Sequence, residues 1–154
     1  LSTSAGIQVH IACVNFKNKT YYWLIVFQAI GYQSVQGIHI SSLSGHRVPI
    51  SPGNHFYSAT KFCVRSLTEG HRQELRDLKT NIRVAAISPG FVATDFFVNA
   101  LHSTSSNTFG VTDLFSTMKP IDPVDVADSV VYILSTPPHV QVHDILMRPT
   151  QQKT

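Results

Sequence analysis

Tyr57 and Lys61 are the two residues of this sequence best suited to acid–base chemistry. They lie four positions apart in a segment with helical periodicity, so both side chains would project from one face of a helix. A free phenol has a pKa of about 10 and is a poor base at neutral pH. A nearby ammonium is expected to lower that pKa, so that the phenol can exchange a proton with a carbonyl or an alcohol. The spacing also arises by chance, so the pair needs support from its surroundings.

Two polar turns accompany the pair. Ser42 ends a strand-like segment, and Gly45 follows it by three residues. Further along, Pro89-Gly90 ends a second apolar segment, and Thr94 follows Gly90 by four residues. In an open α/β sheet, ligands bind beyond the carboxyl ends of the strands. We therefore expect both turns to meet the Tyr-Lys pair in one crevice; the alternative is that they are ordinary caps between strands and loops.

The elements that would position these residues alternate in type from residue 37 onward. The pattern predicts strands over 37–42, 82–88 and 143–148, a long helix over 56–78, and a second helix that starts at Asp122-Pro123 and ends before Pro137-Pro138. This order indicates an α/β domain with a parallel sheet and right-handed crossovers, which place helices on both faces. A short helix over 95–101 and a polar loop over 103–110 are also expected.

Each predicted helix has an apolar face that we expect to lie against the sheet. On the first helix this face comprises Val64, Leu67, His71, Leu75 and Leu78, with Arg65 and Glu69 exposed. On the second it comprises Val126, Val130, Val131 and Leu134.

The first 36 residues have a different character. Residues 1–60 contain three basic residues and no acid, and the first carboxylate is Glu69. Residues 8–15 are compatible with a buried strand, whereas 21–30 are compatible with a strand or a buried helix, because periodicity does not separate the two at this length.

Composition excludes several kinds of protein. The chain has 154 residues, of which 43% are hydrophobic, which suits one globular domain and argues against wholesale disorder. No block of lysines and arginines accompanies the net charge of +3, so nucleic acid is not an expected partner. The longest apolar run is about half of what a membrane span needs. Since no secretory signal opens the sequence, a cytoplasmic protein is expected. The eight histidines form no HExxH motif, and no metal site is predicted.

The motifs as a set carry a family resemblance. ISSLSG at 40–45, YSATK at 57–61 and ISPGFVAT at 87–94 resemble the short-chain dehydrogenases/reductases. Shorter stretches, among them SGHRV at 44–48, FYSATKF at 56–62 and DILMRPT at 144–150, are similar to two narrower groups within that family. The resemblance covers about residue 37 to the end, and it implies part of a Rossmann-like doubly wound parallel sheet.

The resemblance implies a role for each matching residue. Tyr57 would be the general acid/base, Lys61 would lower its pKa and bind the nicotinamide ribose, and Ser42 would hold the substrate oxygen. Ser44 is the alternative to Ser42, because the commoner spacing in the family is two residues shorter. The residues that would contact NADP are Tyr57, Lys61, Pro89, Gly90, Val92 and Thr94. The implied substrate is a small hydrophobic alcohol or ketone, such as a steroid or an isoprenoid like farnesol, and a homodimer is implied through the long helix.

The sequence departs from the family in its first half. The family's glycine turn, Thr-Gly-x-x-x-Gly-x-Gly, lets a helix N-terminus approach the pyrophosphate, and no three of the eight glycines have that spacing. The Asn-Asn-Ala-Gly stretch and the asparagine of the proton relay are also absent. We therefore expect a single partial domain over 1–154 that lacks the pyrophosphate-binding half.

Two interpretations of the incomplete domain follow. The chain derives from an active NADP-dependent oxidoreductase, or it is an inactive fragment or pseudoenzyme that serves, if at all, as a subunit-interaction module. Residues 1–36 either cover the exposed sheet edge or are foreign sequence, and we favour the second.

Overall fold

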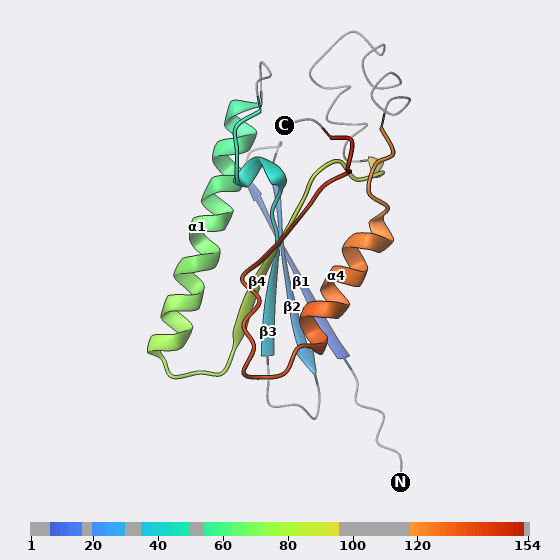
Figure 1. Ribbon diagram of the computed structural model, residues 1–154. Coiled ribbons are helices and arrows are strands. Elements are labelled where there is room, and N and C mark those ends of the chain that lie inside the picture. Colours follow the sequence, from blue (N-terminus) through green and yellow to red (C-terminus); the bar gives the residue numbers. More distant parts are fainter. Residues whose placement is uncertain (1–6, 17–19, 30–34, 50–53, 96–117, 153–154) are drawn as a thin grey trace.

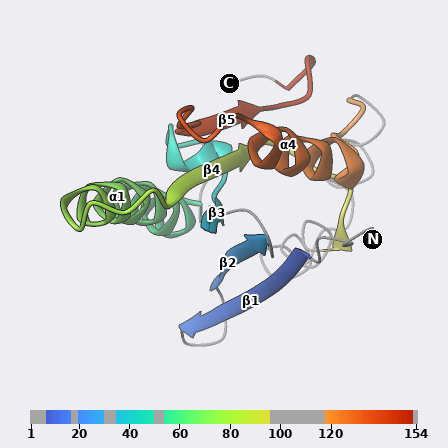
Figure 2. The same ribbon diagram turned by 90° about the horizontal axis from the view of Figure 1, so that it is seen from below.

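A single twisted sheet organises the molecule, with one long helix on each side (Figure 1). This computed structural model describes residues 7–16, 20–29, 35–49, 54–95 and 118–152. The five strands lie in the order of the sequence: β1 (Ile7–Phe16), β2 (Thr20–Ala29), β3 (Val35–Ile40), β4 (Arg83–Pro89) and β5 (Asp144–Met147). The helices are α1 (His55–Asp77) and α4 (Pro123–Ser135), and a short 3₁₀ helix, η1 (Leu43–Gly45), follows β3. Figure 2 looks along the strands and shows α1 and α4 on opposite sides of the sheet.

The parallel part of the sheet confirms the predicted fold class. β3 pairs with β4, and β4 with β5, both in parallel, and α1 and α4 form the two crossovers. The predicted helix over 56–78 and strand over 82–88 agree with α1 and β4 to within one residue at each end. All seven residues of β4 are buried, as its nearly continuous apolar sequence predicts for a strand covered on both sides.

The N-terminal segment forms an antiparallel hairpin on the edge of that parallel sheet. β1 pairs with β2 along their whole length, and β2 pairs antiparallel with β3, from Trp23 opposite Ile40 to Gln28 opposite Val35. Residues 21–29 of the segment that the sequence left open between strand and helix therefore belong to a strand. Because β2 supplies the hydrogen bonds, this edge of β3 is not left unpaired.

The two sides of the sheet differ chemically. On the side of α4, Ile38, Ala85 and Ile87 form the apolar core with Ile133 of that helix. On the side of α1, the sheet instead presents His39, whose Nδ1 lies 2.7 Å from Thr68 Oγ1 of the helix. Successive side chains of a strand point to opposite faces, so this division follows from alternation along β3 and β4.

The polar side of the sheet corrects the predicted apolar face of α1. The buried residues of α1 are Ser58, Lys61, Val64 and Thr68. Leu67 and Leu78, which we expected to face the sheet, are 55% and 72% exposed. The helix meets small and polar residues of β3 and β4, so Ser58 and Thr68 are turned inward together with Val64, while Leu67 and Leu78 lie outside.

Specific hydrogen bonds mark both the start and the end of α4. Asp122 accepts a hydrogen bond from the Val124 N–H, and Asp125 accepts one from the Asp122 N–H, which makes the predicted helix start a complete capping box. At the other end, Arg83 Nη1 donates to the carbonyl oxygens of residues 136, 137 and 140. Val131, predicted to be inside, is 62% exposed, and Ile133 takes its place in the core.

Some expectations fall outside the described part. The helix over 95–101 lies there except for its first residue, and so does the whole loop over 103–110. Within the described residues, neither helix combines the length and hydrophobicity that crossing a membrane requires.

Candidate active site

Ser42 and Tyr57 meet at the carboxyl end of β3. Ser42 follows the strand by two residues and has an extended backbone, with φ −162° and ψ 157°, as it enters η1. Its hydroxyl oxygen accepts the Ser44 N–H at 3.1 Å, and the same hydroxyl makes a side-chain hydrogen bond with Tyr57 in the first turn of α1. That bond lowers the pKa of Tyr57, which is the effect of a proton donated by Ser42 to the phenol oxygen. Ser42 and Tyr57 are thus brought together, while the choice between Ser42 and Ser44 as the serine that holds a substrate stays a prediction.

Lys61 lies one helical turn further along α1, with its amine turned inward. The side chain is only 5% exposed, and Nζ lies 5.6 Å from the centre of the Tyr57 ring. The ammonium donates to the carbonyl oxygen of Ile40, the last residue of β3, at 3.4 Å. Burial lowers the pKa of Lys61 from 10.5 to about 8. The predicted spacing therefore does bring the amine and the phenol together on one face.

The pKa of Tyr57 itself differs from the expectation. We expected Lys61 to lower it, but the pKa of Tyr57 is raised, chiefly because the phenol is removed from water and only partly offset by the hydrogen bond from Ser42. Desolvation disfavours the charged phenolate, and this effect of burial is the larger one for Tyr57. At neutral pH Tyr57 is therefore a protonated phenol, suited to giving a proton.

Gly45 sets how closely the turn with Ser42 approaches α1. A Cβ at this position would lie 2.9 Å from the carbonyl oxygen and 3.1 Å from the carbonyl carbon of Lys61. It would also lie 3.0 Å from Ser41 Oγ. Since helix backbone cannot yield as a side chain can, only glycine allows η1 to rest on this part of α1.

The predicted cofactor-binding turn lies at the end of the neighbouring strand. Pro89 is the last residue of β4, and the N–H of Gly90 donates to the Met147 carbonyl of β5 at 2.7 Å. Val92 forms a parallel bridge with Ile121, and Thr94 is exposed. Backbone hydrogen bonds join this segment to β5 and to Ile121. Because β3 and β4 are parallel, the turn lies at the same end of the sheet as Ser42.

The C-terminal tail closes over that turn. A Cβ on Gly90 would lie 2.9 Å from Arg148 Cβ and would also meet the side chain of Gln152. Gln152 Oε1 accepts the Phe91 N–H at 3.2 Å, and Gln151 Oε1 accepts the Lys119 N–H at 3.1 Å. The glycine of the Pro-Gly motif is therefore needed for close contact with the chain's own tail.

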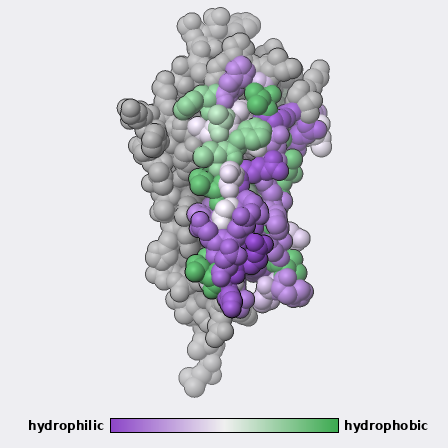
Figure 3. Space-filling view, turned by 90° about the vertical axis from the view of Figure 1, so that its left-hand side faces the viewer, coloured by the Kyte–Doolittle hydropathy of each residue, from purple (hydrophilic) through white to green (hydrophobic). Residues whose placement is uncertain are grey.

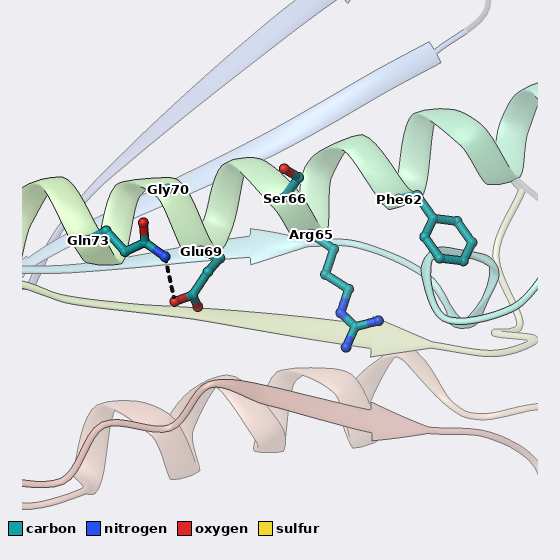
Figure 4. A pocket seen from close by; sticks show the side chains of 6 residues that line it. All are labelled: Phe62, Arg65, Ser66, Glu69, Gly70 and Gln73. Atoms are coloured by element: carbon teal, nitrogen blue, oxygen red, sulfur yellow. Dashed lines mark hydrogen bonds between the residues drawn. The ribbon is translucent and has the colours of Figure 1, made fainter.

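A shallow groove of about 500 Å³ lies elsewhere, on the outer side of α1. Figure 4 shows its lining residues along one helix, with Phe62, Arg65 and Glu69 projecting from the same side. The groove contains none of the predicted site residues.

Sequence reasoning missed His46, whose ring contacts both β4 and β5. Its Nε2 lies 3.1 Å from Ser88 Oγ and 3.1 Å from Asp144 Oδ2. The only sequence signal was its place directly after Gly45, in the stretch that resembles one narrower group. No group of three or more histidine, cysteine or acidic side chains within the described residues could hold a metal ion.

Known proteins resemble this chain in sequence over most of its length. A profile described as short chain dehydrogenase matches residues 14–104. Dehydrogenase/reductase SDR family member 11 of Bos taurus is 52% identical over 117 residues, which are 76% of this chain and 45% of that protein. The farnesol dehydrogenase of Aedes aegypti is 33% identical over 129 residues, which are 82% of this chain and 48% of that protein. These are the two narrower groups that the short motifs resemble, so that resemblance is confirmed, and the chain spans less than half the length of either relative.

Solved structures show the same fold. The serine dehydrogenase of Escherichia coli is 27% identical, with a TM-score of 0.54, over 76% of this chain and 41% of that one. A closed form of serine dehydrogenase complexed with NADP+ is 26% identical, with a TM-score of 0.56, over 76% of this chain and 45% of that one. The predicted Rossmann-like architecture, present in part, is therefore confirmed.

Proposed function

Because the chain belongs to the short-chain dehydrogenase/reductase family, we propose that it carries the substrate side of an NADP-dependent oxidoreductase. The reaction would interconvert a small hydrophobic alcohol and its ketone or aldehyde. The observation that supports this most is a buried Lys61 amine beneath a phenol that Ser42 already hydrogen-bonds. Perturbed ionisable groups gathered at the carboxyl end of parallel strands are typical of an active site.

The residues present fit the nicotinamide end of such a cofactor. An ammonium has three N–H donors, and Lys61 uses one of them on Ile40, so it can also hydrogen-bond the ribose hydroxyls. Pro89, Gly90, Val92 and Thr94 would contact the nicotinamide from the next strand. When bound, NADP would supply or accept the hydride at the carbonyl carbon, which is the chemistry of the cofactor.

Tyr57 would exchange the proton with the substrate oxygen. Since burial raises its pKa, the phenol is protonated at neutral pH and is ready to donate a proton as a carbonyl is reduced. In the opposite direction the same oxygen would take the proton of an alcohol. Ser42 would hold the substrate oxygen against Tyr57, because its hydroxyl already forms a hydrogen bond with the phenol.

Resemblance alone supports the finer assignments. The farnesol dehydrogenase of Aedes aegypti is named for an isoprenoid alcohol, and one structural neighbour was solved with NADP+. We accordingly propose a steroid or isoprenoid substrate and NADP as cofactor.

Substitution of Tyr57 by phenylalanine tests this function. The chain would be assayed for NADPH oxidation with farnesal and with a steroid ketone, and Tyr57→Phe should lower kcat at least about 100-fold, the usual scale for losing a general acid. Tyr132→Phe is the matched control, because that tyrosine is 57% exposed on α4. Turnover by Tyr57→Phe equal to that of the parent would refute the role of Tyr57.

One observation favours a second function. The sequence has no Thr-Gly-x-x-x-Gly-x-Gly turn for the pyrophosphate, so the second candidate is an inactive module that binds other subunits. A fluorescence titration with NADPH separates the two. Saturable binding below millimolar concentration would reject the inactive module, and no binding would support it.

The outer side of α1 would be the surface for a homodimer. Figure 3 faces this helix and shows hydrophobic residues gathered over its N-terminal half, where Phe56 and Phe62 are exposed. Leu67, near the middle of the helix, is exposed as well. Gly70 has open space around it, although glycine within a helix costs about 1 kcal/mol relative to alanine. A helix from a second copy resting on Gly70 would explain that cost. Sedimentation showing only monomers at high concentration would exclude this dimer.

A further inference from the structure

The ring of His46 ties three elements of the fold together. His46 is the residue directly after η1, and its Nε2 lies 3.1 Å from Ser88 Oγ of β4 and 3.1 Å from Asp144 Oδ2 at the start of β5. These partners are 42 and 98 residues away in the sequence. The turn that contains Ser42 is therefore attached to β4 and to β5 through the side chain of His46.

The three residues are not arranged for hydrolysis. A serine nucleophile and an orienting carboxylate must bond different nitrogens of the histidine, whereas Ser88 and Asp144 share Nε2. The serine is also fully buried and out of reach of a substrate. A structural role fits the geometry better.

The hydrogen bond with Asp144 determines which nitrogen of the His46 ring carries the hydrogen. A carboxylate only accepts hydrogen bonds, so Nε2 must carry the hydrogen. The other oxygen of this carboxylate, Oδ1, is buried with no hydrogen-bond partner among the described residues. Loss of the imidazole would leave a half-buried charge without its donor, which is costly, so the pair holds His46 firmly in place.

Short backbone bonds carry this restraint back to Ser42. The N–H of His46 donates to the Leu43 carbonyl at 3.0 Å, and the N–H of Gly45 donates to the Ser42 carbonyl at 2.8 Å. These bonds link His46 to the residues of the turn that begins at Ser42. Gly45 presses it onto the backbone of α1 at Lys61, and His46 holds it from the side of the sheet.

We propose that His46 is a positioning residue, which keeps the Ser42 hydroxyl in hydrogen-bonding reach of Tyr57 by anchoring η1 to Ser88 and Asp144. The inference rests on the proposed function, since it assigns a support to that same site. His46 would act through the geometry of the turn, and no proton is transferred to its ring.

The test reads the ionisation of Tyr57 in the 154-residue chain and needs no turnover. Tyrosine labelled with ¹³C at Cζ would be titrated by NMR in the parent, in Ser42→Ala and in His46→Leu. A neutral hydrogen bond is worth about 1 kcal/mol, so its loss should raise the Tyr57 pKa by about 0.7. We expect Ser42→Ala and His46→Leu to give this same rise, and the double variant to give no more than either one.

Matched variants separate positioning from general loosening. His46→Gln keeps an N–H donor at similar reach and should hold the Tyr57 pKa near that of the parent. His39→Gln removes another buried imidazole on the same side of the sheet, one bonded to Thr68, and should leave the Tyr57 pKa unchanged.

Two results would overturn the inference in distinguishable ways. If Ser42→Ala raises the Tyr57 pKa and His46→Leu does not, His46 has no positioning role and the proposed site survives. If Ser42→Ala has no effect either, the Ser42–Tyr57 pair fails, and with it the proposed site. Should His46→Leu not fold, ¹⁵N shifts of the parent decide the matter: hydrogen on Nε2 of neutral His46 is expected, and hydrogen on Nδ1 alone would refute the anchor.

Discussion

The amine of Lys61 lies 5.6 Å from the centre of the Tyr57 ring, and both side chains are drawn into the same corner between α1 and the end of β3. An ammonium over an aromatic face is attracted to it, but a single carbonyl at 3.4 Å replaces little of the water that the charge has lost. The lowered pKa of Lys61 reflects this loss of hydration, which its contacts do not fully replace. A buried ammonium with so few hydrogen-bond partners costs stability.

Replacing Lys61 by methionine should therefore stabilise the fold near neutral pH. The folded pKa of about 8 lies below the unfolded value of 10.5, so the unfolded chain binds the proton more tightly. Stability from this group is complete above pH 10.5 and is lost as the pH falls through 8. The difference corresponds to about 3 kcal/mol at pH 7. Urea unfolding of Lys61→Met and of the parent at pH 7 would measure the gain.

The pH dependence is the control for this gain. At pH 10 the parent has recovered most of the loss, so the advantage of Lys61→Met should shrink. An advantage of the same size at pH 7 and pH 10 would mean that better packing, and not the buried charge, is responsible.

His39 should make the fold sensitive to mild acid. Burial, helped by His71 and Arg72, lowers the pKa of His39 from 6.5 to about 4. Because the folded value is the lower one, its contribution to stability is complete above pH 6.5 and is lost as the pH falls towards 4. The loss is about 3 kcal/mol for this shift, and chemical unfolding at pH 7 and pH 4.5 would measure most of it.

His39→Gln is the variant that isolates this effect. Glutamine does not titrate, so the variant should lose less stability than the parent between pH 7 and pH 4.5. His139→Gln, which changes a histidine at an exposed position, should behave as the parent does. An equal loss in the parent and in His39→Gln would assign the acid sensitivity to other groups.

Local sequence signals predicted the parts of this molecule that local forces build. The interval between Tyr57 and Lys61 fixed their common face, and Asp122 with Pro123 marked the start of α4 correctly. Each of these depends on a few neighbouring residues, so a single sequence contains the information.

Long-range features were not predictable in the same way. Which face of α1 turns inward depends on the side chains that β3 presents. His39 of β3 hydrogen-bonds Thr68, so Thr68 is buried while the neighbouring Leu67 is exposed. The rise in the Tyr57 pKa depends on burial, which spacing does not give. The anchor between His46 and Asp144 joins residues 98 positions apart, and no motif connects them.

A methyl group at Gly45 should move η1 and the adjacent Ser42 away from Tyr57 and Lys61 of α1. In Gly45→Ala the added Cβ would lie 2.9 Å from a backbone oxygen of Lys61, so η1 must move away from α1. Overpacking of this kind typically costs about 1–3 kcal/mol, and the Ser42–Tyr57 hydrogen bond should be lost with it. Urea unfolding and the Tyr57 titration would measure the two effects. Gly70→Ala, measured at a concentration where the protein is monomeric, is the matched control, because nothing in the chain lies within 4 Å of the added carbon, and it should stabilise the helix by about 1 kcal/mol. If Gly45→Ala were as stable as the parent and kept its Tyr57 pKa, the close approach of η1 to Lys61 would not be what holds Ser42 in place.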